Sequence, residues 1–318
     1  MSQVNRPEVI AFLNAIKEEP DDNSFRLILA DYLEERDDPR GTFLRCETEI
    51  ASMDRFDDRI WDFKKQRDEL WSLHRNEWLG SFASYVNHAT LRDDEQSSRG
   101  LLAVEMSKQR LLDPTTLSLA NSEIWSWVDE LRTKLNRNNI LGLDDLGLLS
   151  HLATLDLSGS MLRRVGASAL AKTSFLSNVR RLILADCELT TAGLDSLLAS
   201  RRLTELATLD LSQNELRPPS FEVLSQADLQ LDELILQDNQ LNFAGMSELV
   251  KASWMEGLRS LDLSRNYLSG DTLTPIVACE ALADLTKLKI SDCRRDEPVV
   301  HQLALATFSS QLSELDFS

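Results

Sequence analysis

Apolar residues recur along the second half of the chain in one repeated pattern. The pattern LxxLxLxxNxL has successive starts at Leu152, Val179, Leu206, Leu231, Leu258 and Leu285. The starts are 27 residues apart, except that the copy beginning at Leu206 is 25 residues long. A seventh start lies at Leu312, and a weaker copy begins at Val128. Self-similarity at a period of this length predicts one supersecondary unit that is stacked several times.

Each copy predicts one short strand followed by one helix. Leucines two positions apart, such as Leu209 and Leu211, lie on the same face of a strand. Later in the copy, residues four positions apart, such as Leu241, Gly245 and Leu249, share one face of a helix. A single unit of this kind cannot bury its leucines, whereas stacked units bury a continuous core. We therefore expect an α/β solenoid.

One position of each copy, directly after the predicted strand, holds a polar side chain or a thiol. Its occupants are Ser160, Cys187, Asn214, Asn239, Asn266 and Cys293. There the chain turns towards the helix, so backbone groups leave the sheet while still buried and need hydrogen-bond partners. Asn, Cys and Ser all carry a donor, so we expect these six residues to form a structural ladder. A redox or nucleophilic role for the thiols would need an activating neighbour, which the sequence does not show.

Residues 128–318 resemble leucine-rich repeat proteins in repeat length and in the shared Asn/Cys position, and among these the ribonuclease-inhibitor-like class. The resemblance implies a horseshoe in which parallel strands line the concave face and helices cover the convex face. It also implies a cytosolic protein. The short copy has Pro218 and Pro219 at its predicted helix start, where proline is tolerated. We expect only a local change in curvature there.

The first 81 residues predict a small helical domain. Apolar periodicity favours helices in PEVIAFLNAIKEE, in FRLILADYLEER, from about Pro39, and in RIWDFKKQRDELWSLHRNEWL. The stretch from Phe12 to Arg45 resembles the bacterial repeat-companion domain, recognised by a proline-aspartate turn before an ADWLEER-like helix. Here Tyr32 replaces the usual tryptophan, and Asp37 stands where glycine is common. The resemblance implies a domain that precedes repeats and carries no enzymatic activity.

These patterns divide the chain into three parts. We expect a helical repeat-companion domain at 1–81, a connection and N-terminal cap at 82–127, and the leucine-rich repeat domain at 128–318. In the first part, the run ADYLEERDD offers carboxylates at a spacing that a metal site would use. A solvated face with cap residues and salt bridges to Arg26, Arg36 and Arg40 is the simpler interpretation, because no histidine completes a site.

The amino-acid composition and net charge argue against some classes of binding partner. The chain has 318 residues, 42% hydrophobic, and a net charge of -18. No basic stripe is present, which argues against nucleic acid and against an anionic membrane surface as partners. The N-terminus has no secretory pattern and no apolar run spans a bilayer, so we expect a cytoplasmic protein. The four cysteines show no CxxC spacing, which argues against a disulfide framework or a zinc site.

The residues between the strand leucines point away from the core, and the resemblance places them on the concave face. Their middle column reads Asp156, Ile183, Asp210, Ile235, Asp262, Lys289 and Asp316. An open concave face is the usual recognition surface of solenoids, whereas the alternative is a solvated face that keeps the chain dispersed. We expect a protein partner to bind at Asp156, Arg181, Ile183, Asp210, Glu233, Ile235, Asp262, Lys287 and Lys289.

The sequence contains no GxSxG, HExxH, Walker A or GxGxxG motif. We therefore expect a non-catalytic interaction module, a scaffold, adaptor or inhibitor, without cofactor or metal. An alternative is a regulator of an enzyme such as a GTPase or kinase, or part of a ubiquitin-ligase-like enzyme with Cys46 as nucleophile. Cys46 lies in a predicted helix between Arg45 and Glu47, where a buried packing role is the simpler interpretation.

The last stretch, LSELDFS, provides the strand of a seventh copy without a helix after it. A terminal parallel strand leaves backbone groups unpaired along its outer edge, with Leu315 and Phe317 only partly covered. We expect self-association or partner binding at this edge, unless the chain is a piece of a longer protein.

Overall fold

The structure is a computed structural model that describes residues 5–54, 56–80, 83, 88–90, 101–111, 113, 116, 122–135, 140, 149, 152–292, 303–304 and 306–316. The chain divides into two compact units. The first comprises 1–133 with 146–153, and the second comprises 134–145 with 154–318. The three-part division expected from the sequence differs from these units, since the stretch 82–127 and the weak copy at Val128 fall mainly in the first.

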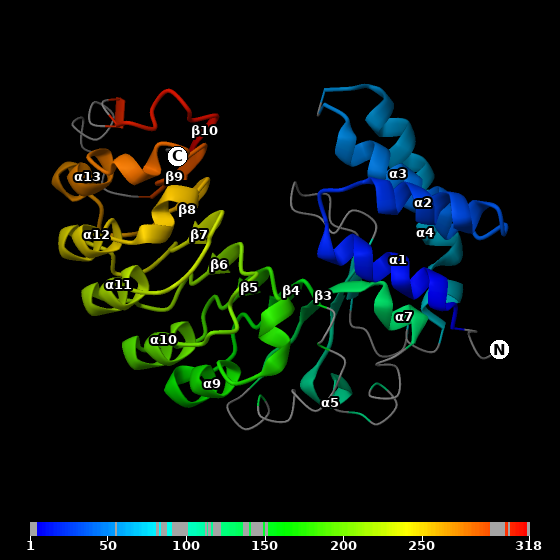
Figure 1. Ribbon diagram of the computed structural model, residues 1–318, viewed down its shortest axis with the longest axis horizontal. Coiled ribbons are helices and arrows are strands. Elements are labelled where there is room, and N and C mark those ends of the chain that lie inside the picture. Colours follow the sequence, from blue (N-terminus) through cyan, green and yellow to red (C-terminus); the bar gives the residue numbers. More distant parts are fainter. Residues whose placement is uncertain are drawn as a thin grey trace. The chain divides into compact units, whose positions relative to one another are not determined.

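The first unit begins with the four predicted helices, α1 (Pro7–Glu18), α2 (Ser24–Glu34), α3 (Arg40–Ser52) and α4 (Arg59–Leu79) (Figure 1). The core of α1 to α3 comes from apolar positions such as Leu13 and Leu33, which are fully buried, whereas the buried residues of α4 are Arg67 and Leu79. Asn23 directly precedes α2, but its side chain makes no cap hydrogen bond. Instead, Asp22 Oδ1 accepts the backbone N–H of Ser24 at 2.8 Å.

Among its described residues, the rest of the first unit supplies three strands and the short helices α5 and α7. Strand β1 (His88–Thr90) pairs antiparallel with β2 (Leu102–Glu105), and β2 pairs parallel with β3 (Val128–Arg132). Helices α5 (Lys108–Leu111) and α7 (Glu123–Ser126) lie between β2 and β3 in the sequence. The weak copy at Val128 therefore supplies β3.

The second unit contains one parallel strand for each predicted copy. The strands are β4 (Thr154–Asp156), β5 (Arg181–Ile183), β6 (Thr208–Asp210), β7 (Glu233–Ile235), β8 (Ser260–Asp262), β9 (Lys287–Lys289) and β10 (Glu314–Asp316). Each pairs parallel with the next, without a slip in register. The strand leucines form the core, as Leu209 and Leu211 show by being fully buried.

Helices stack along one side of these strands (Figure 1). They are α9 (Arg163–Leu170), α10 (Thr191–Leu198), α11 (Pro218–Ser225), α12 (Phe243–Leu249) and α13 (Gly270–Val277), with 3-10 helices η3 (Ser174–Asn178), η4 (Ser253–Gly257) and η5 (Glu280–Leu282). The predicted helical glycine allows neighbouring helices to approach closely. A Cβ built on Gly245 of α12 would lie 2.6 Å from Phe221 Cδ2 of α11. The α/β solenoid expected from the pattern is confirmed.

Each turn from strand to helix passes through a left-handed residue. Positive φ angles occur directly before the polar position of each copy, at Gly159 (70°), Asp186 (54°), Gln213 (56°), Asp238 (55°), Arg265 (57°) and Asp292 (54°). This backbone conformation is strained for most residues with a Cβ. Glycine and aspartate tolerate it better, yet Gln213 and Arg265 adopt it too. The repeated turn thus overrides the local preference of these two residues.

Candidate functional site

The strand residues between the leucines form continuous rows across the second unit. Register pairs Asp210 with Ile183 on one side and with Ile235 on the other, and Ile235 pairs in turn with Asp262. The row continues from Asp262 to Lys289 and Asp316. Neighbouring strands lie about 4.8 Å apart, so this row brings residues far apart in the sequence onto one surface. We call it the concave row, Asp156–Ile183–Asp210–Ile235–Asp262–Lys289–Asp316.

Three aspartates of the concave row accept backbone hydrogen bonds at the ends of their strands. The backbone N–H of Ser158 donates to Asp156 Oδ1 at 2.9 Å, and that of Ser212 donates to Asp210 Oδ1 at 2.8 Å. Ser264 N–H makes the same bond to Asp262 Oδ1 at 3.0 Å. One carboxylate oxygen of each aspartate thus accepts a local bond, which fixes the direction of the side chain. A short polar side chain that bonds its own backbone two residues on is a recurrent turn device.

Accessibility varies along the concave row. Asp156 is only 2% exposed and Ile183 9%, whereas Asp210, Ile235, Asp262 and Lys289 are half-buried. Both Asp156 and Ile183 were expected to contact a partner, so the accessible part of the row begins later in the sequence than predicted. Burial raises the pKa of Asp210 above its ordinary value, although its hydrogen bonds with Ser212 act in the opposite direction.

A second row lies beside the concave row. It includes Arg181, Thr208, Glu233, Ser260, Lys287 and Glu314, paired in this order across β5 to β10. The Glu233 carboxylate accepts hydroxyl hydrogen bonds from Thr208 at 3.4 Å and from Ser260 at 3.3 Å. Lys287 Nζ lies 3.6 Å from Glu314 Oε2. The two rows therefore place Asp210, Glu233 and Asp262 between Arg181 on one side and Lys287 and Lys289 on the other.

The polar position after each strand forms a ladder of hydrogen bonds behind this face. Asn214 Oδ1 accepts the backbone N–H groups of Cys187 and Leu189, each at 3.0 Å. Its Nδ2 donates to the carbonyl oxygens of Leu184, at 2.8 Å, and Leu211, at 3.0 Å. Asn239 and Asn266 repeat this arrangement in the following copies. The backbone N–H of Leu216 donates to Asn239 Oδ1, and that of Leu241 donates to Asn266 Oδ1.

The smaller occupants of the ladder position make fewer bonds. Cys187 Sγ donates to Leu157 O at 3.2 Å, and Ser160 Oγ accepts the backbone N–H of Leu135 at 2.9 Å. Burial raises the pKa of the Cys187 thiol to about 12. A thiol with that pKa is protonated at neutral pH, which fits a hydrogen-bond donor rather than a nucleophile. The sixth predicted occupant, Cys293, lies outside the described residues.

Several carboxylates of the acidic run ADYLEERDD in the first unit form ion pairs with arginines. Asp31 and Glu34 pair with Arg45, whose Nη2 lies 2.5 and 2.8 Å from their carboxylates. Asp38 lies 2.9 Å from Arg6 and 2.7 Å from Arg40. Arg40 was a predicted partner, whereas Arg6 and Arg45 were not. Within the described ranges, no group of His, Cys, Asp and Glu side chains is placed to hold a metal ion.

A cluster of two arginines and two carboxylates ties α7 to the start of the chain. Arg6 Nη2 lies 2.6 Å from Glu123 Oε1, and its Nε donates to Glu123 Oε2 at 2.9 Å. Arg40 Nη1 lies 3.2 Å from the same Glu123 oxygen Oε1, and both arginines contact Asp38. Residues 6 and 123 are too far apart in the sequence for any periodicity to link them, so the sequence carried no signal for this cluster.

Comparisons with known proteins show similarity to a leucine-rich repeat in one copy. A family model described as Leucine Rich Repeat matches residues 257–279, whereas no curated protein matches significantly. Among solved structures, an internalin from Listeria monocytogenes is similar, with 16% identity and a TM-score of 0.32. That match covers 68% of this chain and 66%, just under two thirds, of the internalin chain. Among the described residues, none of the helices is long and apolar enough to cross a membrane. The match at residues 257–279 falls on the copy that begins at Leu258, so this copy of the repeated pattern is similar to a leucine-rich repeat.

Proposed function

We propose that the chain is a non-catalytic interaction module that binds a protein partner through the concave face of its second unit. The observation that carries this proposal is the concave row, in which half-buried carboxylates alternate with isoleucines. Apolar side chains supply contact area, while charged ones supply orientation and selectivity. Because Asp210 and Asp262 each already accept a bond from their own turn, they are held in place before a partner arrives, which lowers the entropic cost of binding.

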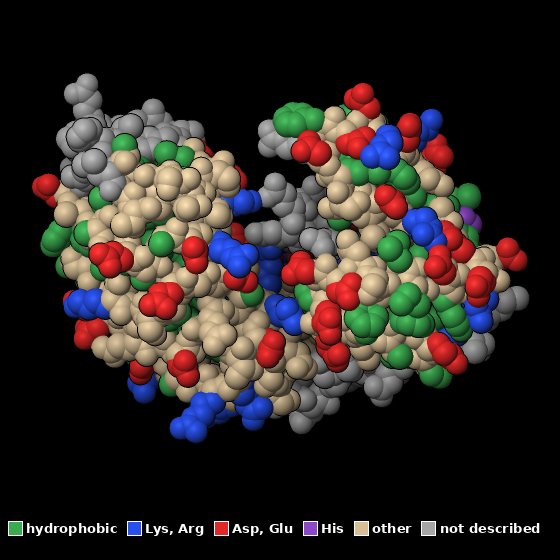
Figure 2. All heavy atoms as spheres, turned by 45° about the horizontal axis from the view of Figure 1, so that its top comes forward, with side chains coloured by type: hydrophobic (Ala, Val, Ile, Leu, Met, Phe, Trp, Pro, Cys, Tyr) green, Lys and Arg blue, Asp and Glu red, His purple; other side chains and the backbone are tan. Residues whose placement is uncertain are grey.

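The charge order of the face suggests the chemistry of the partner. Asp210, Glu233 and Asp262 lie between Arg181 on one side and Lys287 and Lys289 on the other. A complementary partner segment has basic residues at its centre, an apolar residue against Ile235, and acidic residues towards its ends. Acidic side chains are scattered over the visible surface of both units (Figure 2), so the alternation with isoleucine distinguishes this face better than its acidity does.

A charge-reversal experiment tests the proposed face. The double variant Asp210→Lys/Asp262→Lys is compared with Glu222→Lys/Glu280→Lys, whose carboxylates are exposed on the helix side. Both variants change the net charge equally, so a general electrostatic effect weakens capture of cell proteins by both. The proposal expects quantitative mass spectrometry to show loss of specific partners only for the first variant. Equal loss in both, or loss only in the second, contradicts it.

The proposal of a non-catalytic role is supported at Cys46, the residue that a ligase-like enzyme would use. Cys46 is 2% exposed, and its Sγ lies 3.5 Å from Gln66 Oε1. Burial, assisted by the charge of Glu47, raises the pKa of the thiol to about 11. Such a thiol is a poor nucleophile at neutral pH. Rapid alkylation of Cys46 in the native protein would argue against this interpretation.

We also propose that the first 81 residues are a repeat-companion domain, of the bacterial kind that the sequence resembles. Asp37, which stands where that family has glycine, has a φ of 54°, a conformation in which glycine is favoured. Arg36 lies over the Tyr32 ring at 3.7 Å, where the family has tryptophan. A reducing cytoplasm is the proposed location, since Cys46, Cys187 and Cys279 are buried free thiols.

We propose in addition that the chain self-associates through the outer edge of β10. Glu314 is exposed and Leu315 is 45% exposed, although it occupies a strand position that is buried in the other copies. Among the described strands β10 is the last of the sheet, and a strand edge with an exposed leucine is a template for pairing with another chain. Sedimentation velocity at micromolar concentration tests this, with Leu315→Lys as the variant. A monomer before and after the substitution contradicts the proposal.

A further inference from the structure

The helix side of the second unit has a hollow of about 840 Å³ at the ends of α10 and α11. Its lining includes Leu198, Ala199, Ser200, Ala227, Asp228 and Leu229. Its volume falls in the range of about 300–1,000 Å³ that small-ligand sites occupy. The hollow lies at the end of the copy that is two residues short. The sequence predicted only a local change in curvature there, so the hollow is a feature that sequence analysis missed.

The equivalent place one copy further along is filled by a tryptophan of the chain itself. Trp254 lies in η4 and is only 4% exposed. Its Nε1–H donates to the carbonyl oxygen of Leu224, in the last turn of α11, at 3.2 Å. A buried indole usually needs a partner for its N–H group, and the end of the preceding helix provides one. The gap between consecutive repeat helices is therefore a site that accepts an indole.

The two places correspond residue by residue. Buried Leu229 closes the short copy as buried Met255 closes the next, so Asp228 stands in the position of Trp254. Asp228 is exposed, and residues 226–230 form no 3-10 helix like η4. The short copy thus has neither the aromatic side chain nor the 3-10 helix of the next copy at this place.

The residue whose carbonyl oxygen accepts the indole N–H of Trp254 has a counterpart in α10, Leu197, which is itself fully buried and does not line the hollow. Leu224 O accepts the backbone N–H groups of Gln226 and Ala227 in addition to the indole. Leu197 occupies the same position in α10, and its carbonyl accepts the N–H groups of Ala199 and Ser200. The hydrogen bonding around Leu197 and Leu224 is thus the same except for the indole.

We propose that this hollow binds a tryptophan side chain of a partner protein, as the equivalent place in the next copy holds Trp254. Tryptophan combines a large apolar surface with one donor and often dominates the energy of protein interfaces. The exposed carboxylates of Asp195 and Asp228 line the hollow together with Arg201, so a basic residue beside the tryptophan complements the rim. This second surface lies on the helix side and is independent of the concave face.

The chain provides the probe for a direct test. A heptapeptide with the sequence of Lys251–Gly257, acetylated, amidated and carrying 5-fluorotryptophan at the position of Trp254, is titrated into the full chain and followed by fluorine NMR. The proposal expects a saturable shift with a Kd below about 1 mM, and competition by the unlabelled peptide but not by its tryptophan-to-alanine version. Absence of a saturable shift overturns the proposal.

Two substitutions, one within α10 and one directly after its last residue, test whether the peptide binds in the hollow. Ala192 within α10 and Ala199 directly after it are both exposed, but only Ala199 lines the hollow. Ala199→Arg is expected to weaken peptide binding at least about tenfold, while Ala192→Arg leaves it unchanged. Equal binding by both variants overturns the proposal. Asp228→Trp places an indole in the hollow from within, so it is expected both to raise the melting temperature and to block the peptide. A folded Asp228→Trp protein that binds the peptide like the wild type also overturns it.

Discussion

The side-chain oxygen Oδ1 of Asn239 accepts the backbone N–H of Asn214, its counterpart in the preceding copy, at 3.2 Å. The same oxygen accepts Leu216 N–H at 2.9 Å, while Nδ2 donates to carbonyl oxygens of both copies, among them Leu211 and Leu236. One side chain thus satisfies backbone groups that neither sheet nor helix can pair. The ladder joins each turn to the next and keeps the concave row in register.

Removing one rung of the ladder is expected to destabilise the second unit. Asn239→Ala leaves buried donors and acceptors of two copies without partners, which we expect to cost about 1–3 kcal/mol. Gln226→Ala, at an exposed position, is the control and is expected to change little. The midpoint of urea unfolding measures both. Equal midpoints for the two variants contradict the role of the ladder.

Substituting glutamine by glycine is expected to have opposite effects on stability at two positions, because only one of them has a left-handed backbone. Gln213 has a φ of 56°, whereas Gln226 has a φ of -88°. Gln213→Gly relieves backbone strain and is expected to raise the free energy of unfolding by roughly 0.5–1 kcal/mol. Gln226→Gly gains no such relief and is expected to lower it by a similar amount. Thermal melts that move in the same direction for both variants contradict the assignment.

Close packing of neighbouring helices predicts the effect of a single added methyl group. Gly245→Ala places a Cβ 2.6 Å from Phe221 Cδ2, so α11 or α12 must shift, which we expect to cost about 1–3 kcal/mol. The control is Gly257→Ala, where the nearest atom is Leu231 O at 3.6 Å. Calorimetry is expected to show a lower melting temperature only for Gly245→Ala. An unchanged melt for that variant would mean that the helices are less tightly packed than described.

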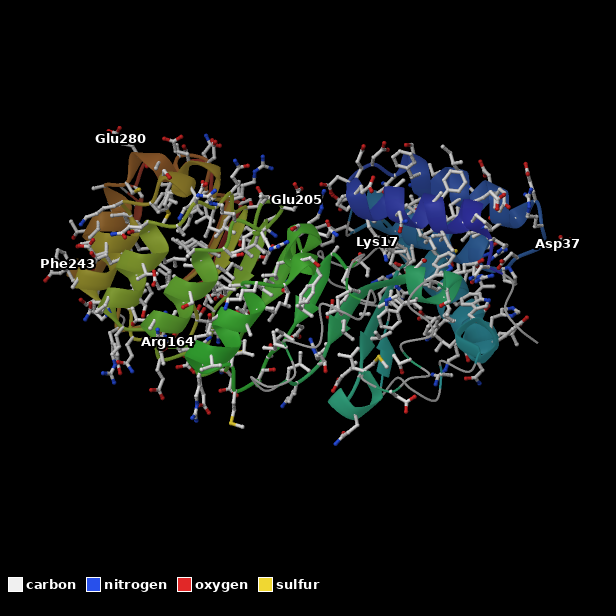
Figure 3. The ribbon with its side chains drawn as sticks, turned by 60° about the horizontal axis from the view of Figure 1, so that its bottom comes forward. Lys17, Asp37, Arg164, Glu205, Phe243 and Glu280 are labelled. Carbon is white, nitrogen blue, oxygen red and sulfur yellow. The ribbon has the colours of Figure 1, made fainter. Side chains whose placement is uncertain are left out.

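Lys17 predicts a pH dependence of stability in the first unit. Its Nζ donates to Val128 O at 2.6 Å (labelled in Figure 3), and burial lowers its pKa from 10.5 to about 8 despite the nearby Asp129. Between about pH 8 and 10.5 the unfolded chain keeps a proton that the folded chain has lost. The free energy of unfolding contributed by this group therefore rises with pH across the window, by at most about 3 kcal/mol.

Two buried thiols lower the free energy of unfolding as the pH rises further, which is the opposite of the effect of Lys17. Cys46 and Cys187 have pKa values raised to about 11 and about 12, so the folded chain keeps protons there that the unfolded chain loses above about pH 9. The window from pH 8 to 9 therefore isolates Lys17. Denaturant titrations of the wild type and of Lys17→Met across this window are expected to show a rise only in the wild type. Parallel curves contradict the buried, deprotonating lysine.

Periodicity predicted those parts of the structure that repeat. The strand leucines, the ladder residues and the concave row all follow from copies in constant register, as Asp210 opposite Ile183 and Ile235 illustrates. Features that occur once could not be predicted in this way. The ion pair of Arg6 with Glu123 depends on how the chain folds back over 117 residues. The burial of Asp156 also needs the tertiary structure, since its sequence environment matches that of Asp210.

The hollow between α10 and α11 belongs to the same class of unpredicted features. The two-residue shortening of the copy at Leu206 is visible in the sequence, but its consequence depends on what the missing residues would have filled. In the next copy Trp254, which is 4% exposed and bonded to Leu224 O, fills the equivalent place, and this contact depends on the tertiary structure.

Photo-crosslinking in the source cell tests the central claim most directly. A photoreactive phenylalanine replaces Ile235 on the concave face or, as the control, Phe243, which is 53% exposed and projects from the helix layer (Figure 3). The account predicts a discrete protein adduct from position 235, which disappears when Asp210→Lys and Asp262→Lys are introduced into the same chain. No adduct at position 235, or an adduct there that persists unchanged with both lysines, would contradict partner binding through the concave row.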